Sequence, residues 1–222
     1  SFTGIKGLKI ILQDDVKKIL PEIDVVIDFT EIKSSLSNAE AVASEKKALV
    51  IGTTGFSTSE TELLKQKLHG TRCVLSPNMS IGINVMFKIV RSIARILKDD
   101  YDIEIVEAHH RMKKDAPSGT ALRLGNIIAE ALNRNLDKVG IFGRKGVLGE
   151  RKTQEIGVHA VRAGDIVGDH TVLFAGPGER LEIIHRAHSR DTFAAGAVKA
   201  ALWVMDQAPG IYSMEDVLGF HA

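Results

Sequence analysis

The first eighty residues alternate short apolar segments with longer polar ones. Ile23–Phe29, Ala48–Ile51 and Arg72–Ser76 are short and mostly apolar, which is typical of strands covered on both faces. Between them, Lys33–Lys46 and Thr58–Leu68 have the composition of helices. Strand, helix, strand, helix, strand in this order predicts parallel strands joined by right-handed crossovers.

The longest helix is predicted at Ile81–Lys98, where apolar residues recur at helical spacing. A strand is predicted at Asp102–Ala108, followed by a polar loop and a helix from about Gly119 to Asn133. A last helix is predicted at Asp191–Met205, which has an apolar stripe.

The segment from Val139 to Ser189 has a different pattern, with many glycines and three further strand candidates. Its short glycine-rich connections predict hairpins and antiparallel pairing. The candidates are Gly157–Arg162, His170–Ala175 and Arg180–His188.

These patterns predict an α/β fold with two lobes and a ligand cleft between them. Residues 1–80 and 190–222 are expected to form a Rossmann-like parallel-sheet domain. Residues 81–189 are expected to form an α+β domain with a mixed or antiparallel sheet.

Composition narrows the functional classes. Of 222 residues, 44% are hydrophobic, and 29 Lys and Arg nearly balance 28 Asp and Glu, so bulk nucleic-acid binding is not expected. No apolar run is long enough for a membrane helix, and Ser1–Leu20 has no signal-peptide pattern. Cys73 is the only cysteine, which excludes an intramolecular disulfide and favours a reducing, cytoplasmic location.

The densest polar segment is Glu107–Thr120, EAHHRMKKDAPSGT, between a predicted strand and a predicted helix. Loops at the carboxyl ends of strands are where α/β proteins place their sites. Two histidines, an arginine, two lysines and an aspartate in seven residues indicate anion binding and proton transfer.

The helix after this loop begins at Pro117-Ser118-Gly119-Thr120. A helix start with free N–H groups, a hydroxyl and a glycine can cradle a carboxylate or phosphate. An ordinary capped helix after a solvated loop is the alternative, and the cationic residues just upstream favour a functional site.

No metal site is expected. His109 and His110 are neighbours that diverge, and His185 and His188 would point to opposite faces of a strand. His159 is expected to pair with His170 across two strands, and Cys73 to be a small core residue.

Two turns follow adjacent predicted strands, Gly52-Thr53-Thr54-Gly55 and Ser76–Ser80. Together they suggest one ligand along the edge of the sheet, although no G-x-G-x-x-G follows an early strand. Gly143–Lys152 is expected to be a solvated basic loop, and Arg190 is a candidate hinge or ligand contact.

The segment EAHHRMKKDAPSGTA closely resembles the signature of the dihydrodipicolinate reductase family. The resemblance continues in order along almost the whole chain. The further matching segments are IDFT at Ile27–Thr30, IGTTGF at Ile51–Phe56, PNMSIGINV at Pro77–Val85, RAGDIVGDHTVLF at Arg162–Phe174 and SRDTFAAGAVKAALW at Ser189–Trp203.

The resemblance implies reduction of a cyclic imine dicarboxylate on the diaminopimelate route to lysine, with NADH or NADPH. It also implies a homotetramer assembled through the mixed-sheet domain. It implies His109 as proton donor, Lys113 as the residue that holds substrate and stabilises the transition state, and His110 as a contact of one carboxylate. Ser118, Gly119 and Thr120 would bind the other carboxylate. The implied cofactor contacts are Gly52, Thr53, Thr54, Ser76, Asn78, Met79 and Arg190.

One departure from the family pattern concerns the beginning of the sequence. The resemblance starts near Gly7–Leu20, so the family's first strand, glycine-rich loop and helix are expected to be absent and cofactor binding to be weakened. A non-catalytic oligomeric module that binds substrate but has lost its cofactor is therefore the alternative function. A different amino-acid dehydrogenase is disfavoured by the detailed match of the loop.

Overall fold

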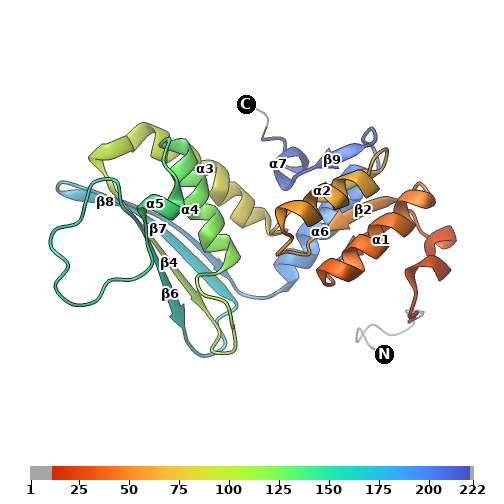
Figure 1. The fold of residues 1–222 in the computed structure, drawn as a ribbon, viewed down its shortest axis with the longest axis horizontal. Coiled ribbons are helices and arrows are strands. Elements are labelled where there is room, and N and C mark those ends of the chain that lie inside the picture. The colour runs from red at the N-terminus through yellow and green to blue at the C-terminus, as the bar shows by residue number, and fades with distance from the viewer. Residues whose placement is uncertain (1–11, 221–222) are drawn as a thin grey trace. The chain divides into compact units, whose positions relative to one another are not determined.

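A computed structural model describes residues 12–220, and the chain in it forms two compact units (Figure 1). The first unit contains the residues up to Leu75 together with Ala200–Ser213, and the second contains Ser76–Lys199 and the residues from Met214. The second unit therefore includes three segments: the Ser76–Ser80 turn, residues 190–199 and the residues from Met214. The sequence-based boundaries had placed all three with the first. The predicted start of the family resemblance lies partly outside the described residues.

The first unit is built on a four-stranded parallel sheet in the order β1-β2-β3-β9. The three predicted parallel strands are confirmed, and a short strand from near the end of the chain, β9, pairs with β3. The strands are β1 (Val25–Asp28), β2 (Ala48–Ile51), β3 (Arg72–Leu75) and β9 (Gly210–Tyr212).

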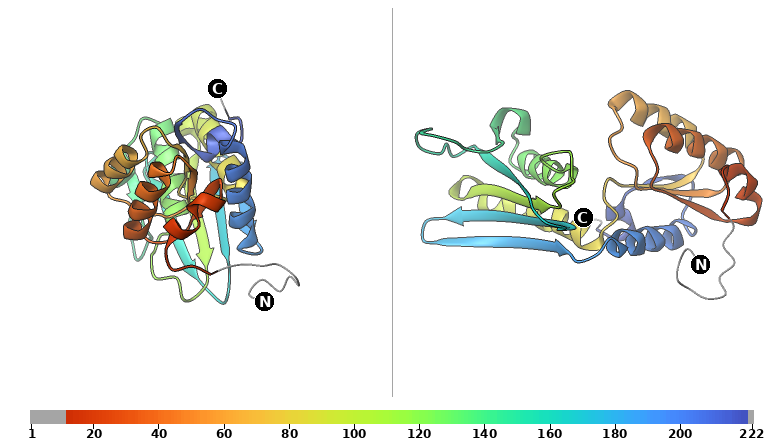
Figure 2. Two further views of the ribbon diagram at one scale, coloured as in Figure 1. Left: turned by 90° about the vertical axis from the view of Figure 1, so that its right-hand side faces the viewer. Right: turned by 90° about the horizontal axis from the view of Figure 1, so that it is seen from below.

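Helices cover both faces of this sheet, which explains why its central strand β2 is apolar and buried along its whole length. Figure 2 shows α1 (Ile32–Ser44) and α2 (Thr58–Lys67) on one face and the end of α6 on the other. Cys73 lies in the core under α1 and α2, and burial raises the pKa of its thiol to about 12, so it is the inert core residue that was predicted. Two short 3₁₀ helices precede β1, at Val16–Lys18 and Leu20–Glu22.

The second unit is built on a five-stranded mixed sheet in the order β5-β6-β4-β7-β8. β4 pairs in parallel with β6 and antiparallel with β7, and β7 and β8 form the predicted hairpin. The strands are β4 (Asp102–His109), β5 (Gly140–Ile141), β6 (Ile156–Arg162), β7 (Gly168–Gly176) and β8 (Glu179–Ala187).

Two predictions about this sheet are wrong. β6 and β7 follow each other in sequence but do not pair, because β4 lies between them. For the same reason His159 does not pair with His170. His159 lies opposite Val106, and His170 lies between Glu107 and His185. β4, which comes earlier in the chain, lies between these two strands. A short loop between two consecutive strands does not exclude such an arrangement.

Two long helices, α3 and α4, lie over one face of the mixed sheet and form its core (Figure 1). Ser80 and Ser118 cap their N-termini by accepting the N–H groups of Ile83 and Ala121. The helices of this unit are α3 (Ile81–Leu97), a 3₁₀ turn at Lys98–Asp100, α4 (Gly119–Ala131), α5 (Leu136–Val139), the first part of α6 (Asp191–Val204) and α7 (Met214–Val217). Within residues 12–220, no helix has the length and apolar character required to cross a bilayer.

Candidate active site

The polar segment singled out in the sequence begins on β4 and ends on α4. β4 runs to His109, and the loop returns to the first turn of α4 at Ser118. The loop after β6 pairs with it, since Ala163 N–H donates to His109 O (2.9 Å) and Arg111 N–H donates to Gly164 O (3.1 Å). The backbone on both sides of the loop is therefore held by the mixed sheet.

A fully buried carboxylate, Glu107, lies at the centre of this region. Arg162 donates to both of its oxygens at 2.8 Å, in the bidentate geometry typical of strong arginine–carboxylate pairs. The Ser118 N–H donates to Oε1 at 2.9 Å, and His109 Nδ1 lies 2.5 Å from Oε2. Glu107 therefore connects the strand, the helix start and the predicted proton donor.

The charges of this group follow from their surroundings. Burial acts to raise the pKa of Glu107, but the hydrogen bonds from Arg162, His109 and Ser118 outweigh it and lower that pKa below its usual value. Burial lowers the pKa of His109, and Glu107 opposes this shift without cancelling it. At neutral pH the free site therefore holds a carboxylate next to a neutral imidazole.

Only one ring nitrogen of His109 is engaged by the carboxylate of Glu107. With Nδ1 directed at Glu107, the other nitrogen, Nε2, lies beside the backbone of Gly168. A Cβ atom at Gly168 would lie 3.1 Å from Nε2, so glycine leaves this side of the ring open. The side chain of His109 is 12% exposed, which makes it accessible to a ligand but largely shielded from water.

Two further histidines extend the cluster along the sheet. The rings of His109 and His170 meet edge to face with centroids 5.3 Å apart, and His170 Nε2 lies 3.3 Å from Ser118 Oγ. His185 lies next to His170, and its Nε2 is 3.5 Å from Ser80 Oγ. Burial, with the nearby His109, lowers the pKa of His170 to about 3, so this ring is neutral.

Lys113 and His110 lie on the loop between β4 and α4. Lys113 Nζ forms an ion pair with Asp115 at 2.9 Å, and Arg162 donates to the Asp115 carbonyl oxygen at 2.7 Å. His110 is half-buried, and its Nδ1 has no hydrogen-bond partner among the described residues. A buried polar atom without a partner is rare in proteins and fits a ligand contact.

The start of α4 has the features of an anion cradle. No described atom lies within 4 Å of the position that a Cβ would take at Gly119, so chain packing does not require glycine there. Thr120 Oγ1 accepts a hydrogen bond from Asn78 Nδ2 (3.1 Å), which leaves the hydroxyl hydrogen of Thr120 free to be donated. The structure therefore brings Asn78, a predicted cofactor contact, next to Thr120, a predicted substrate contact.

The turn that contains Asn78 is tightly constrained. Ser76 Oγ donates to Asn78 O (2.9 Å), and Asn78 Oδ1 accepts the N–H of Ser80 (2.8 Å). Met79 is buried, and the backbone of Gly196 on α6 approaches its carbonyl oxygen so closely that a Cβ would lie 1.8 Å away. The turn is thus a rigid platform beside the predicted substrate residues.

The remaining predicted cofactor residues lie mostly in the first unit. Gly52, Thr53 and Thr54 line a pocket of about 640 Å³ beyond the carboxyl ends of β1 and β2, with the residues from Phe29 to Lys33. A Cβ at Gly52 would lie 2.3 Å from the Phe29 ring, so glycine is needed there. The Thr53 hydroxyl is buried and accepts from Ser35 Oγ (2.8 Å), so it braces the pocket from behind. Arg190 is an exposed residue just before α6 in the second unit.

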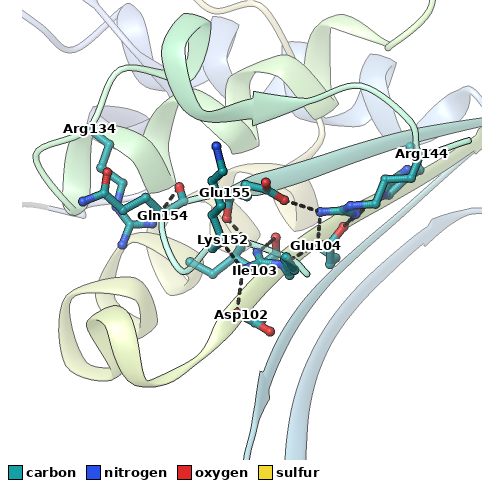
Figure 3. A network of polar contacts seen from close by, with 10 residues as sticks. Asp102, Ile103, Glu104, Arg134, Arg144, Lys152, Gln154 and Glu155 are labelled. Carbon is teal, nitrogen blue, oxygen red and sulfur yellow. Dashed lines mark hydrogen bonds and ion pairs between the residues drawn. The ribbon is translucent and has the colours of Figure 1, made fainter. Parts of the chain in front are cut away.

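A second glutamate clamped by arginine lies on the opposite face of β4. Glu104 accepts two hydrogen bonds from Arg144 (both 2.9 Å), one from Arg151 (3.0 Å) and one from His159 (2.7 Å). Figure 3 shows Arg144 reaching Glu104 and Glu155, so the loop between β5 and β6 is tied to the sheet rather than simply solvated. Burial acts to raise the pKa of Glu104, but the hydrogen bonds from Arg144, His159 and Arg151 outweigh it and lower that pKa to about 2.

Sequence reasoning missed the residues that surround His109, namely Glu107, Arg162, Gly168 and His170. One signal was available, because Ile103, Ile105 and Glu107 share a face of the strand and the glutamate is the charged exception on it. Partners on other strands depend on the order of the sheet, which the sequence pattern misjudged. No group of residues suited to hold a metal ion occurs in the described part of the chain.

Comparisons with known proteins agree on one family. Two family models match, described as dihydrodipicolinate reductase, N-terminus (residues 1–79), and dihydrodipicolinate reductase, C-terminus (residues 82–218). The 4-hydroxy-tetrahydrodipicolinate reductase of Syntrophus aciditrophicus is 54% identical over all of this chain and 82% of its own length. That of Syntrophobacter fumaroxidans is 53% identical over 96% of this chain and 79% of its own length.

A solved structure agrees with these relatives. Dipicolinate-bound dihydrodipicolinate reductase from Paenisporosarcina sp. TG-14 superposes with a TM-score of 0.69 and 25% identity, over 90% of this chain and 76% of that one. A probable dehydrogenase from Thermotoga maritima shares the fold, with a TM-score of 0.54 and 11% identity over 92% of this chain and 77% of that one.

Proposed function

The chain belongs to the dihydrodipicolinate reductase family, and from this premise we propose that it reduces 4-hydroxy-tetrahydrodipicolinate or dihydrodipicolinate to tetrahydrodipicolinate. It is an oxidoreductase that uses a pyridine nucleotide, and we propose NADH or NADPH as the donor. We place the reaction on the diaminopimelate route to lysine.

The protein must supply the proton of this reaction. The hydroxylated substrate gives the conjugated cyclic imine by losing water. Reduction of that imine adds a hydride to one ring carbon and leaves a neighbouring, electron-rich carbon that needs a proton. A bound reduced nicotinamide supplies the hydride. In the proposal, His109 donates the proton from Nε2, the ring nitrogen next to Gly168.

The substrate itself helps to charge His109. Burial keeps the imidazole neutral in the free site, because it lowers the pKa of His109. Two substrate carboxylates close to the ring favour its cationic form and raise that pKa. The donor is therefore protonated when substrate is present.

The chain offers separate groups for the two carboxylates of the substrate. Lys113 would leave Asp115 to pair with the substrate, and the unpartnered Nδ1 of His110 would contact one carboxylate. The Gly119 N–H and the Thr120 hydroxyl would bind the other, with Ser118 beside them at the start of the helix. Two carboxylates held at fixed points orient the ring between them.

The pocket of the first unit fits part of a nucleotide. It lies at the carboxyl ends of two parallel strands, which is where open α/β sheets bind such ligands. Phe29 is half exposed and offers a ring face, and Gly52 allows a close backbone approach. We propose Gly52, Thr53 and Thr54 as the cofactor contacts in this pocket. Ser76, Asn78, Met79 and Arg190 are the proposed cofactor contacts in the second unit.

The observation that carries this proposal is the loop from β4 to α4. It brings a half-buried histidine, a lysine and an open helix start together, and these are the groups that a dicarboxylate substrate and a proton transfer require. A chain that only bound the substrate would not need the proton donor.

The test follows oxidation of NADH and of NADPH by the chain with freshly generated 4-hydroxy-tetrahydrodipicolinate. We expect turnover with at least one cofactor and much less with His109→Gln. If the folded chain binds dipicolinate but oxidises neither cofactor, the non-catalytic module is the correct function. Turnover of other amino-acid-derived imines at a similar rate would favour the different dehydrogenase.

We also propose a homotetramer and a cytoplasmic location. The face of the mixed sheet opposite α3 and α4 exposes apolar side chains, among them Val161 (43%) and Ile184 (46%). Pairing of such faces between copies would bury them. Light scattering on the eluted protein measures the mass, and a monomer would contradict the assembly.

A further inference from the structure

We propose that Glu107 is a positioning residue for His109, and that Arg162 keeps Glu107 ionised so that it can serve this role. Glu107 fixes the tautomer of His109 with hydrogen on Nδ1, so that Nε2 is the nitrogen that gains and donates the catalytic proton. This inference rests on the proposed function, because it explains how the proposed proton donor is prepared.

The assignment of the tautomer follows from the hydrogen bonds of the carboxylate. An ionised carboxylate only accepts hydrogen bonds, so the 2.5 Å contact from Glu107 Oε2 to His109 Nδ1 requires hydrogen on Nδ1. The open nitrogen is then Nε2, which lies beside Gly168. No other histidine of the cluster has a carboxylate partner at hydrogen-bond distance among the described residues.

Arg162 explains why the carboxylate can remain charged without contact with water. Its two terminal nitrogens cover both oxygens of Glu107, and one of them also donates to Asp115 O. The other groups that face His109 are Lys113 from the loop and His170 from β7, and neither is an acid that could replace Glu107. Arg162 thus holds the carboxylate ionised, and Glu107 presents a negatively charged oxygen to the imidazole.

A purely structural role does not account for this arrangement. Glu107 occupies the face of β4 on which Ile103 and Ile105 are buried. An apolar side chain at this position would pack in the core and would need no hydrogen-bond or ion-pair partner. Buried ion pairs often add little stability compared with apolar residues of similar size. Its orientation toward His109 therefore points to a function in the site.

The first experiment is a double-mutant cycle in the reductase assay. Glu107→Gln keeps the shape and removes the charge, and we expect kcat to fall about 10²-fold while KM changes far less. Because Glu107 acts through His109, the double variant E107Q/H109Q should be no slower than H109Q. Losses that multiply in the double variant would overturn the proposal.

The second experiment reads the tautomer directly and does not require activity. In ¹⁵N-histidine NMR spectra, neutral His109 should carry its hydrogen on Nδ1. In E107Q the amide oxygen keeps the Ser118 N–H, the amide NH₂ faces Nδ1, and the hydrogen should move to Nε2. An unchanged tautomer in E107Q would overturn the proposal even if activity fell.

A third readout is the pH profile of kcat/KM. Loss of the negative charge disfavours the imidazolium, so the decline in activity at high pH should begin about one pH unit lower in E107Q. Glu107→Asp retains the charge, and we expect it to keep the wild-type profile if the glutamine variant does not fold. A profile in E107D that matches H109Q would contradict the role of the charge.

Glu104→Gln is the matched control. It removes a carboxylate clamped by arginines from the same strand, but on the face away from His109. We expect unchanged kcat and an unchanged His109 spectrum. If wild-type protein oxidises neither cofactor, the proposed function fails, while the NMR result still decides the tautomer.

Discussion

Two glutamates three residues apart on β4 have almost the same partners and different consequences. Glu104 is clamped by Arg144 and Arg151 and accepts a hydrogen bond from His159, while Glu107 is clamped by Arg162 and contacts His109. An odd spacing on a strand puts them on opposite faces.

The difference between the two clusters lies in what surrounds them. The Glu104 side chain is 24% exposed and ties down a surface loop, whereas the Glu107 side chain is 0% exposed and supports the start of α4. Gly157, directly opposite Glu104, leaves room for the carboxylate, and Gly168 leaves room beside the His109 ring. The same set of side chains therefore fastens a loop on one face and, in our proposal, prepares a proton donor on the other.

The largest expected effect separates the two histidines. His109→Gln removes the proposed proton donor, and kcat should fall about 10²–10⁴-fold with a smaller change in KM. His159→Gln removes the matching histidine of the Glu104 cluster and should leave kcat within about twofold. Steady-state kinetics of both variants check this, and equal losses would show that the comparison is mistaken.

The next effect concerns substrate binding at the start of α4. Thr120→Val removes the hydroxyl that has a hydrogen to donate, so KM should rise about tenfold, as expected for a hydrogen bond to a charged group. Thr120→Ser keeps the hydroxyl and should remain close to wild type. An unchanged KM in the valine variant would remove Thr120 from the carboxylate cradle.

The pH dependence of stability distinguishes the two faces without kinetics. The pKa of His170 is about 3 in the folded chain, against 6.5 ordinarily, so the unfolded chain binds this proton first as pH falls. Stability from His170 is complete above about pH 6.5 and is lost toward pH 3, by at most about 1.4 kcal/mol per pH unit for one proton. Urea unfolding between pH 5 and 7 should show a shallower slope in His170→Gln.

The Glu104 cluster responds in a more acidic range. The pKa of the Glu104 carboxyl is about 2, below its ordinary 4.5. The contribution of this carboxylate to the free energy of unfolding is therefore complete above about pH 4.5 and is lost as pH falls toward 2. If the free energy of unfolding of His170→Gln changes with pH between 5 and 7 as steeply as that of wild type, another group causes the pH dependence in this range.

The smallest effect is expected from the exposed clamp. Glu104→Gln should lower the free energy of unfolding by about 1 kcal/mol, because the pair is partly solvated. Arg144 and Arg151 then lose their hydrogen bonds to Glu104, so the loop of residues 143–152 is held less tightly and trypsin should cleave it faster. Val147→Thr, at an exposed position in the same loop, leaves every trypsin site in place and is the control. A loop equally resistant in both variants would contradict the fastening role.

The sequence predicted the parallel sheet of the first unit and the polar loop between β4 and α4, because both depend on local patterns. The alternation of apolar runs at Ile23–Phe29 and Ala48–Ile51 reports burial on two faces, and the polar loop before Gly119 stands out by its charge. It did not predict β9, whose three residues are too few to show a period.

The order of the mixed sheet is the other failure, and it concealed the environment of His109. Short glycine-rich loops favour hairpins, but β4 offered edges to both β6 and β7. Only that order places Arg162 next to Glu107, so the clamp could not be inferred from either residue alone. Local patterns pointed to the candidate site residues, and pairing between distant strands determined the charged groups around them.

The position of β9 also affects how the protein folds during its synthesis on the ribosome. Its partner, β3, is complete by Leu75, yet residues 210–212 are translated only after most of the second unit. One edge of β3 therefore stays unpaired while residues 76–199 are synthesised and begin to fold. An exposed apolar strand edge invites wrong pairing, so the nascent chain is most vulnerable to aggregation, and most in need of a chaperone, during that interval.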